Sequence, residues 1–238
     1  MGANESSGEP TAPSDGPVWT VVLAAGSGRR YGTAPKQFES LGAERVIDRS
    51  LAIARAAADH VVVVLSAGDE EIGRRLVDDG LADVAVEGGA ERADSVRAAL
   101  AVIDEDAAVI VVHDAARPLA SAELHRAVVA EVHGGADAVI PAVPVTDTIK
   151  RIEHDARGRS IVVETPDRAW LVAVQTPQAF RAGVLRAAHA SGADATDDAA
   201  LVEAVGGTVV VIDGEAANIK ITRPDDLAIA RVLLDTLG

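Results

Sequence analysis

Short apolar runs alternate with amphipathic stretches through most of the chain. Strand-like runs of Val, Ile, Leu and Ala occupy residues 18–23, 60–65, 82–86, 108–113 and 136–143. In one stretch between them, Ile47, Leu51 and Ala54 fall on a single helical face. Strands that are apolar throughout and separated by such helices are typical of a parallel sheet covered on both sides. The pattern therefore predicts an α/β fold with a Rossmann-like, mostly parallel sheet flanked by helices.

The alternation changes between about residues 145 and 175. Residues 145–153 and 160–163 resemble two strands, and a turn-forming sequence at residues 155–158 separates them. This segment is predicted to form a protruding β-arm. Residues 1–17 are rich in Ser, Gly, Pro, Glu and Asp and lack the apolar core of a signal peptide, so we expect a disordered tail there. Residues 18–238 are predicted to be a single domain that includes the arm.

Composition and charge narrow the classes of function. The chain has 238 residues, of which 48% are hydrophobic but only 2% aromatic, so its core consists mainly of Val, Ile, Leu and Ala. A net charge of −15 argues against a nucleic-acid partner or an anionic membrane surface, because the long-range field repels polyanions. The lack of cysteine excludes disulfides and thiolate chemistry. Because no apolar run is long enough to span a membrane, a cytoplasmic protein is expected.

A loop of small residues follows the first predicted strand. It contains Ala25, Gly26 and Gly28, and Arg30 and Lys36 come shortly after. Glycines allow the backbone to approach an anion closely, while free amide groups and nearby cations attract phosphate oxygens. The loop matches neither the Gly-x4-Gly-Lys-Ser/Thr pattern nor the Gly-x-Gly-x-x-Gly fingerprint. It is predicted to hold a triphosphate, with a purely structural tight turn as the alternative.

A second glycine-bearing loop lies between the third predicted strand and an alanine-rich helix. It includes Gly88 and Gly89, and Ser95 stands near the start of the helix. Backbone groups freed by the glycines, together with the Ser95 hydroxyl, suit the polar edge of a nucleobase. The alternative is that Ser95 or Asp94 serves only as the N-cap of the helix.

The fourth predicted strand ends in His113 and Asp114. Ligands of open α/β folds gather at the carboxyl ends of parallel strands. A carboxylate at that place suits Mg²⁺, which takes one or two protein carboxylates and completes its shell with water and substrate phosphates. Asp114 is therefore the metal candidate, whereas His113 is interpreted as a structural residue at the strand end. The spacing of the histidines does not favour a zinc site.

Three further polar segments lie on strand-like backgrounds, at residues 146–151, 165–168 and 218–222. Each alone is typical of a solvated surface. Together they supply cations that can bind a second phosphorylated molecule. Lys220 stands between Ile219 and Ile221 and should point away from both.

Six motifs occur in a fixed order between residues 23 and 222: Leu-Ala-Ala-Gly-Ser-Gly-Arg-Arg, Gly-Gly-x-x-Arg-x-x-Ser-Val, Val-His-Asp-Ala-Ala-Arg-Pro, Asp-Thr-Ile-Lys, Thr-Pro-Gln and Asn-Ile-Lys-Ile-Thr. In this combination the chain resembles the 2-C-methyl-D-erythritol 4-phosphate cytidylyltransferases. The resemblance implies a nucleotidyltransferase fold and transfer of CMP from CTP to methylerythritol phosphate, with release of pyrophosphate, in the non-mevalonate isoprenoid pathway. It also implies Mg²⁺ or another divalent cation and a homodimer formed through the β-arm.

The resemblance further implies roles for individual residues. Transition-state stabilisation around the triphosphate is implied for Arg30 and Lys36, and the Mg²⁺-associated acid is implied to be Asp114. Contacts with CTP are implied for Ala25, Gly26, Gly28, Gly89, Ser95 and Ala115. Binding and orientation of the acceptor phosphate are implied for Asp114, Arg117, Thr148, Arg168 and Lys220, with Arg168 reaching the site of a neighbouring subunit. One departure is Ala90, where relatives often carry a polar residue.

Two other functions remain open from the residues alone. One is a cytidylyltransferase for a different alditol phosphate, such as ribitol 5-phosphate, because the acceptor pocket leaves little trace in the sequence. The other is a nucleotide sensor without catalysis, which the joint presence of Arg30, Lys36 and Asp114 disfavours.

Overall fold

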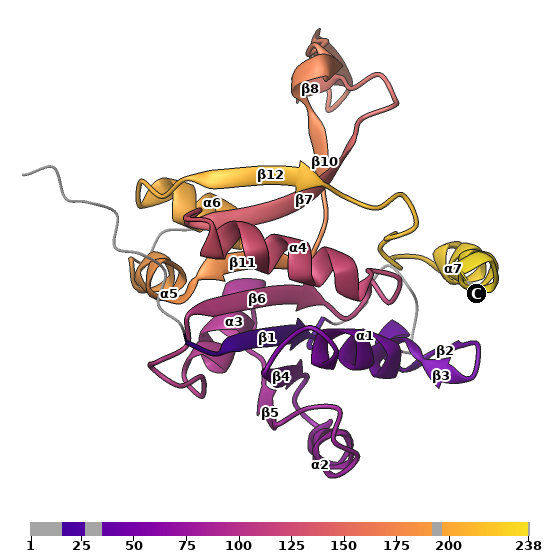
Figure 1. Ribbon diagram of the computed structural model, residues 1–238. Helices are drawn as coiled ribbons and strands as arrows, with labels where there is room; N and C mark the ends of the chain where they lie inside the picture. The colour runs from indigo at the N-terminus through magenta and orange to yellow at the C-terminus, as the bar shows by residue number, and fades with distance from the viewer. Residues whose placement is uncertain (1–15, 27–34, 192–196, 238) are drawn as a thin grey trace, which may run out of the picture.

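The computed structural model describes residues 16–26, 35–191 and 197–237. Within them eight strands form one sheet, in which β10, β7, β11, β6, β1, β4 and β5 follow one another and β12 also pairs with β7 (Figure 1). The strands with parallel partners are β1 (Val18–Leu23), β4 (His60–Leu65), β5 (Val84–Glu87), β6 (Val109–Asp114), β7 (Ala138–Pro144) and β12 (Val209–Asp213). The predicted α/β fold with a mostly parallel sheet is confirmed.

Three strands of this sheet were not predicted: β10 (Val172–Val174), β11 and β12. Strand β11 (Gln178–Arg181) runs antiparallel between β6 and β7, with Ala179 opposite Val111. Strand β12 lies parallel to β7. The five predicted strands are all present, and β5, β6 and β7 start one or two residues later than expected.

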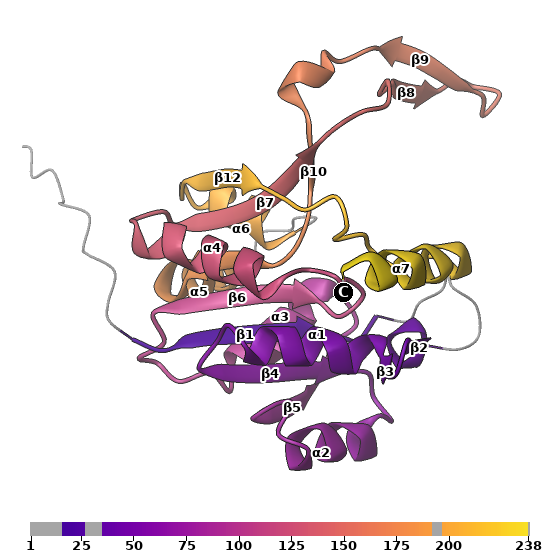
Figure 2. The same cartoon turned by 45° about the vertical axis from the view of Figure 1, so that its right-hand side comes forward.

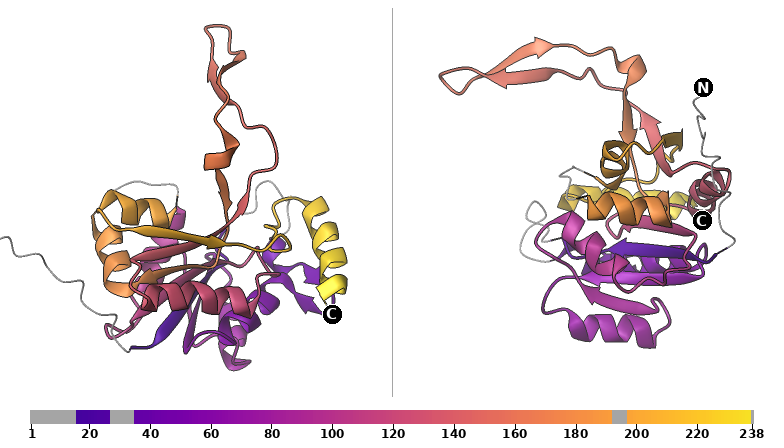
Figure 3. Two further views of the ribbon diagram at one scale, coloured as in Figure 1. Left: turned by 45° about the horizontal axis from the view of Figure 1, so that its top comes forward. Right: turned by 90° about the vertical axis from the view of Figure 1, so that its left-hand side faces the viewer.

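Helices cover both faces of the sheet. One face carries α1 (Val46–Arg55), α2 (Glu70–Asp78) and α4 (Ala122–His133), and the other carries α3 (Arg92–Leu100), α5 (Ala182–Ala190) and α6 (Asp198–Ala204). Successive strand residues point to opposite faces: Val21 packs in the cluster that includes α3 and α5, whereas Val22 packs against α1. Figure 3 shows the sheet between these two layers. Burial of both faces explains why the strands are apolar throughout.

The sheet brings the carboxyl ends of four parallel strands to one edge. In β1, Leu23 is paired with Asp114 of β6 on one side and with Val64 of β4 on the other. Strand β5 ends at Glu87, opposite Leu65. Loops that follow these strands therefore emerge side by side, which is where ligands bind in open α/β sheets.

A hairpin projects from the body of the molecule. It consists of β8 (Arg151–His154) and β9 (Ser160–Glu164), followed by the short helix η2 (Arg168–Trp170) and by β10 (Val172–Val174), which returns to the main sheet beside β7. Figure 2 shows the hairpin held away from the body by the chain that continues β7 and leads into β10. The first strand of the arm is shorter than expected, because residues 145–150 have no regular structure.

Two small elements and the last helix cover the end of the sheet. The short helix η1 (Lys36–Phe38) precedes the hairpin β2 (Ser40–Leu41) and β3 (Glu44–Arg45), and α7 (Pro224–Leu237) packs beside them. Residues 218–222, expected to be strand-like, form neither strand nor helix. Ile221 is nevertheless fully buried in this cluster. In the part of the chain that the structure describes, no helix is both long and apolar enough to cross a membrane.

Removal of core volume at the centre of the sheet is expected to destabilise the fold strongly. Ile110 of β6 is 0% exposed and packs in the largest buried cluster. Ile110→Ala should lower the free energy of unfolding by about 2–5 kcal/mol, because it leaves a cavity. Ile229→Ala on α7, where the residue is 51% exposed, is the matched control and should change it by less than about 0.5 kcal/mol. Urea denaturation measures both, and equal values for the two variants would contradict the assignment of the core.

Candidate active site

A cavity of about 570 Å³ opens where the strand ends meet. Its wall includes many of the residues singled out in the sequence: Ala25, Gly26, Lys36, Gly89, Ser95, Asp114, Ala115 and Lys220. They come from the loops after β1, β5 and β6 and from the segments around η1 and before α7. Gly28 and Arg30 lie outside the described residues. The structure thus brings together residues that are far apart in the sequence at the predicted edge of the sheet.

The start of the loop after β1, residues 24–26, is hydrogen-bonded to neighbouring elements on both sides. The Gln37 side-chain amide donates to the Ala24 carbonyl oxygen at 2.8 Å, and the Ser66 hydroxyl donates to the Ala25 carbonyl oxygen at 3.0 Å. The Ala24 amide donates to Val64 in β4 at 2.8 Å. Because these bonds engage Ala24 and Ala25 from neighbouring elements, they position the described start of the loop at the cavity wall.

The loop after β5 depends on the absence of a side chain at Gly88. A Cβ atom there would lie 2.5 Å from the Ala25 Cβ and 2.7 Å from the Ser95 Oγ. The loop therefore packs directly against both the first loop and the start of α3. The N-cap of α3 is Glu91, whose amide donates to Asp94, so neither Ser95 nor Asp94 occupies the N-cap position that the sequence allowed. Ser95 is buried, and its hydroxyl donates to the Glu91 carbonyl at 3.3 Å.

Asp114 and Lys220 form an ion pair in the cavity wall. The Lys220 Nζ lies 2.6 Å from the Asp114 Oδ2, and 14% of the Asp114 side chain is exposed. Burial opposes ionisation of this carboxyl, but the charges of Lys220 and Arg92 outweigh that effect and lower its pKa. Asp114 is consequently ionised at neutral pH. Lys220 is exposed, whereas its neighbour Ile221 is buried, although the strand on which this alternation was expected does not form.

Lys36 holds the other side of the cavity. Its Nζ donates to the Ile221 carbonyl oxygen at 2.7 Å, which ties η1 to the segment before α7. Lys36 and Lys220 thus approach the cavity from two different elements. With Arg92 they place three cations in the described wall, facing the carboxylates of Asp114 and Glu91.

A buried polar network behind Asp114 was not predicted. The Thr176 hydroxyl accepts from the Asp114 amide at 3.0 Å and lies 3.1 Å from the His113 Nδ1. The Asn218 side-chain amide donates to the Thr176 carbonyl at 2.9 Å, which positions the segment that bears Lys220. Burial lowers the pKa of His113 well below its usual range, so this histidine is neutral, as its structural interpretation requires. In the sequence, the only features that point to this network are the Thr-Pro-Gln and Asn-Ile-Lys motifs, which contain Thr176 and Asn218.

Of the residues implied to bind the acceptor, Asp114 and Lys220 line the cavity, and the other three do not. Arg117 lies behind the wall, where its guanidinium donates to the Asn218 carbonyl at 2.8 Å. Thr148 is exposed at the base of the arm, and Arg168 is exposed in η2, where it donates to the Thr146 carbonyl at 2.6 Å. Neither Thr148 nor Arg168 lines the cavity of its own chain.

The side chains of the cavity wall can supply only part of the coordination shell of a divalent cation. Among the described residues, no group of three or more acidic or histidine side chains is arranged to hold a metal ion. Asp114 offers one carboxylate, which suits Mg²⁺ that arrives with a phosphate chain and takes the rest of its shell from phosphate and water.

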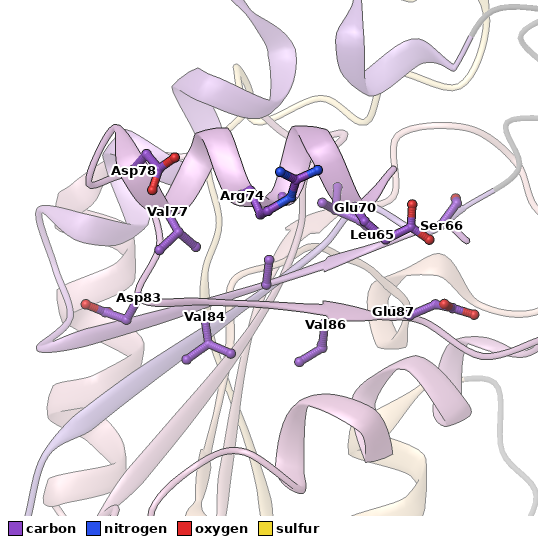
Figure 4. Close-up of a pocket in the computed structure, with 12 residues that line it drawn as sticks. Leu65, Ser66, Glu70, Arg74, Val77, Asp78, Asp83, Val84, Val86 and Glu87 are labelled. Atoms are coloured by element: carbon purple, nitrogen blue, oxygen red, sulfur yellow. The ribbon is translucent and has the colours of Figure 1, made fainter. Parts of the chain in front are cut away.

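A second cavity, of about 450 Å³, lies at the edge of the sheet between α2 and β5 (Figure 4). Its wall includes Leu65, Val77, Val84 and Val86, together with charged side chains such as Arg74. None of the residues implied to act in the reaction lines this cavity. The cavity at the strand ends is therefore the candidate active site.

The fold and the first cavity define a nucleotidyltransferase: glycine-bearing loops after parallel strands, separate cations and one buried carboxylate surround a space of nucleotide size. The family model described as 2-C-methyl-D-erythritol 4-phosphate cytidylyltransferase matches residues 18–236. The chain belongs to this family, which confirms the predicted transferase and its place in isoprenoid precursor biosynthesis.

Similar proteins agree with this assignment. An enzyme of this description from Nocardia farcinica is 44% identical over 94% of this chain and 96% of its own length. One from Rhodococcus jostii is 46% identical over 94% of this chain and 98% of its own length. The crystal structure of the Thermus thermophilus enzyme has a TM-score of 0.73 at 35% identity, covering 90% of this chain and 98% of that one.

The close approach at Gly88 yields a test of the site. Gly88→Ala should weaken CTP binding by about tenfold or more, because the new methyl group displaces Ala25 or Ser95 from the loops. Gly183→Ala in α5, where a Cβ meets nothing within 4 Å, is the matched control. Calorimetric titration with CTP measures both, and unchanged affinity in the Gly88 variant would show that these loops do not bind the nucleotide.

Proposed function

We propose that this chain transfers the cytidylyl group of CTP to 2-C-methyl-D-erythritol 4-phosphate and releases pyrophosphate. The observation that carries the proposal is the meeting of the Gly26 loop, Lys36, Asp114 and Lys220 in one cavity of about 570 Å³. Family membership supports the same reaction. The direct test is pyrophosphate release with CTP, UTP, ATP and GTP, each with methylerythritol phosphate and with ribitol 5-phosphate. Release that depends on CTP and methylerythritol phosphate is expected.

In this proposal the cytosine lies against Gly89 and Ser95, and the triphosphate lies over Ala25 and Gly26. The triphosphate oxygens are neutralised by loop amides and by Lys36, with Arg30 in the same role. Asp114 would hold the divalent cation, which supplies positive charge to the phosphate chain when bound. These placements use the side of the cavity where Gly88 permits close packing of the two loops.

The chemical step is a displacement at the α-phosphorus. An oxygen of the acceptor phosphate forms the new bond, and the bond to the bridging oxygen breaks, so that pyrophosphate leaves with the electron pair. No strong general base is needed, because a phosphomonoester with a second pKa of about 6 is largely dianionic at pH 7. The barrier comes from the approach of two anions, so the main task of Lys36 and Lys220 is to offset charge in the transition state.

Acceptor binding in this proposal requires a second copy of the chain. Arg117 and Lys220 lie at or behind the cavity, but Thr148 and Arg168 lie on the arm. The arm also exposes large apolar side chains: Ile152 at 48%, Val162 at 55% and Trp170 at 86%. Exposed apolar surface of this kind marks an interaction site. We therefore propose a homodimer through the arm, in which Arg168 serves the partner's acceptor site. A cytoplasmic location and residues 18–238 as one domain remain predictions from the sequence.

Loss of Lys36 is expected to reduce turnover more than affinity. Lys36→Ala should lower kcat by about 10²–10³, the loss that follows removal of one preorganised electrostatic stabiliser, with a smaller change in the KM for CTP. Arg75→Ala removes a positive charge that pairs with Glu71 on exposed α2 and is the control. Steady-state pyrophosphate release measures both, and near-normal kcat in the Lys36 variant would refute its role.

Donation of Arg168 across subunits can be tested with mixed dimers. Arg168→Ala should raise the KM for methylerythritol phosphate, because it removes a cation from the acceptor phosphate. A heterodimer of the Arg168→Ala and Lys36→Ala chains contains one site that has both residues intact if Arg168 acts in the partner's site. At methylerythritol phosphate concentrations well below the KM of the Arg168→Ala variant, activity should then recover to about half that of the wild type. Mixed dimers that are no more active than the two parents under these conditions would place Arg168 in the site of its own chain.

A further inference from the structure

A buried ionic network lies behind the loop that follows β5. Asp198, the first residue of α6, is 1% exposed, and its Oδ2 accepts from the Arg92 Nη1 at 2.6 Å. Its Oδ1 lies 3.0 Å from the Nε2 of His189 on α5. The network therefore joins α3, α5 and α6 on one face of the sheet. Of its three members, only Arg92 lines the active-site cavity.

The negative charge of the Asp198 carboxylate, at the centre of this network, is stabilised by both neighbours. Burial opposes ionisation of Asp198, but the hydrogen bond from His189 and the charge of Arg92 outweigh it and lower its pKa. The other ring nitrogen of His189, Nδ1, is buried without a hydrogen-bond partner among the described residues. The polar contact of this ring is thus its bond to Asp198, and the two side chains form one support for Arg92.

Arg92 connects this support to the cavity. It is the first residue of α3 and follows Gly88 and Gly89 by a few positions, and 33% of its side chain is exposed. A guanidinium has five N–H donors in a fixed plane, and the bond to Asp198 engages one of them. Its charge also acts on Asp114 across the cavity. The group is therefore held from behind by Asp198 and remains open toward the cavity.

We propose that Arg92 is an additional nucleotide-binding residue, which contacts an anionic oxygen of the phosphate chain, and that Asp198, held by His189, is its positioning residue. The inference rests on the proposed binding of CTP in this cavity. Lysine could supply the charge but not the planar set of donors that can bind Asp198 and a phosphate oxygen together. A purely structural role, in which the network only ties three helices together, is the competing explanation.

The test replaces both charges at once. In the double variant Arg92→Gln/Asp198→Asn, neutral amides replace both charged groups, so no buried charge loses its partner. We expect this protein to fold and its Kd and KM for CTP to rise about ten- to a hundredfold, with a smaller change in kcat. Arg92→Lys should recover part of the affinity. Asp198→Asn alone should raise the KM for CTP in the same direction, because Arg92 is then held by a neutral amide and no longer by a carboxylate.

Arg186 provides the matched control. It ties α5 to the other end of α3, donating to the carbonyl oxygens of Leu100, Ile103 and Asp104 at 3.0, 3.0 and 2.9 Å. Arg186→Gln should lower the Tm while the Kd for CTP stays unchanged.

The outcomes separate this inference from the proposed function. A folded double variant with the wild-type Kd for CTP would overturn the role of Arg92 in binding. If the double variant does not fold, Arg92→Gln alone decides, because its Asp198 keeps the bond from His189. Direct titration with CTP does not require turnover. Wild-type protein that binds CTP but releases no pyrophosphate would refute the proposed reaction, and the same titrations would still decide the role of Arg92.

Discussion

The ion pair between Asp114 and Lys220 connects the central sheet with the segment before α7, and the shape of the cavity depends on it. That segment has no regular secondary structure, so its position is set by this pair, by the bonds of Asn218 and by burial of Ile221. A carboxylate as buried as Asp114 needs a cation nearby. The groups proposed to meet phosphate during the reaction therefore also hold the wall of the cavity in place.

The same arrangement explains how an acidic protein binds anionic substrates. The whole chain carries a net charge of −15, but three cations face two carboxylates in the described wall of the cavity. Charges on the outer surface are screened beyond roughly 8 Å at physiological ionic strength, whereas those inside the cavity act at contact distance. Small phosphates that enter the cavity are attracted, while long polyanions remain repelled by the surface. The charge distribution thus favours nucleotides and phosphorylated alditols over nucleic acids.

Much of the fold follows from local sequence, and the remainder depends on contacts between distant segments. The strands that carry the site are almost entirely apolar, so their positions and the edge where Asp114 lies could be predicted. Strand β11 has only four residues and includes Gln178 and Arg181, and it is a strand because β6 and β7 flank it. No local pattern marks Asp198 as the partner of Arg92, because the ion pair exists only once α3 and α6 pack together. The hydrogen bond between Asn218 and Thr176 could not be predicted either, because it also joins segments that are distant in the sequence.

The arm differs from the rest of the molecule because its strands are exposed. In the body of the molecule most large apolar side chains are buried by the chain itself, but in the arm the side chains of Ile152, Val162 and Trp170 stay exposed. Arg168 does not line the cavity of its own chain. Association through the arm, as proposed, would bury those side chains and at the same time deliver a cation to an acceptor site. Since apolar burial supplies most of the free energy of such contacts, completion of the site and formation of the dimer become one event. Under this proposal the nucleotide half of the site belongs to a single chain, and the acceptor half belongs to the pair.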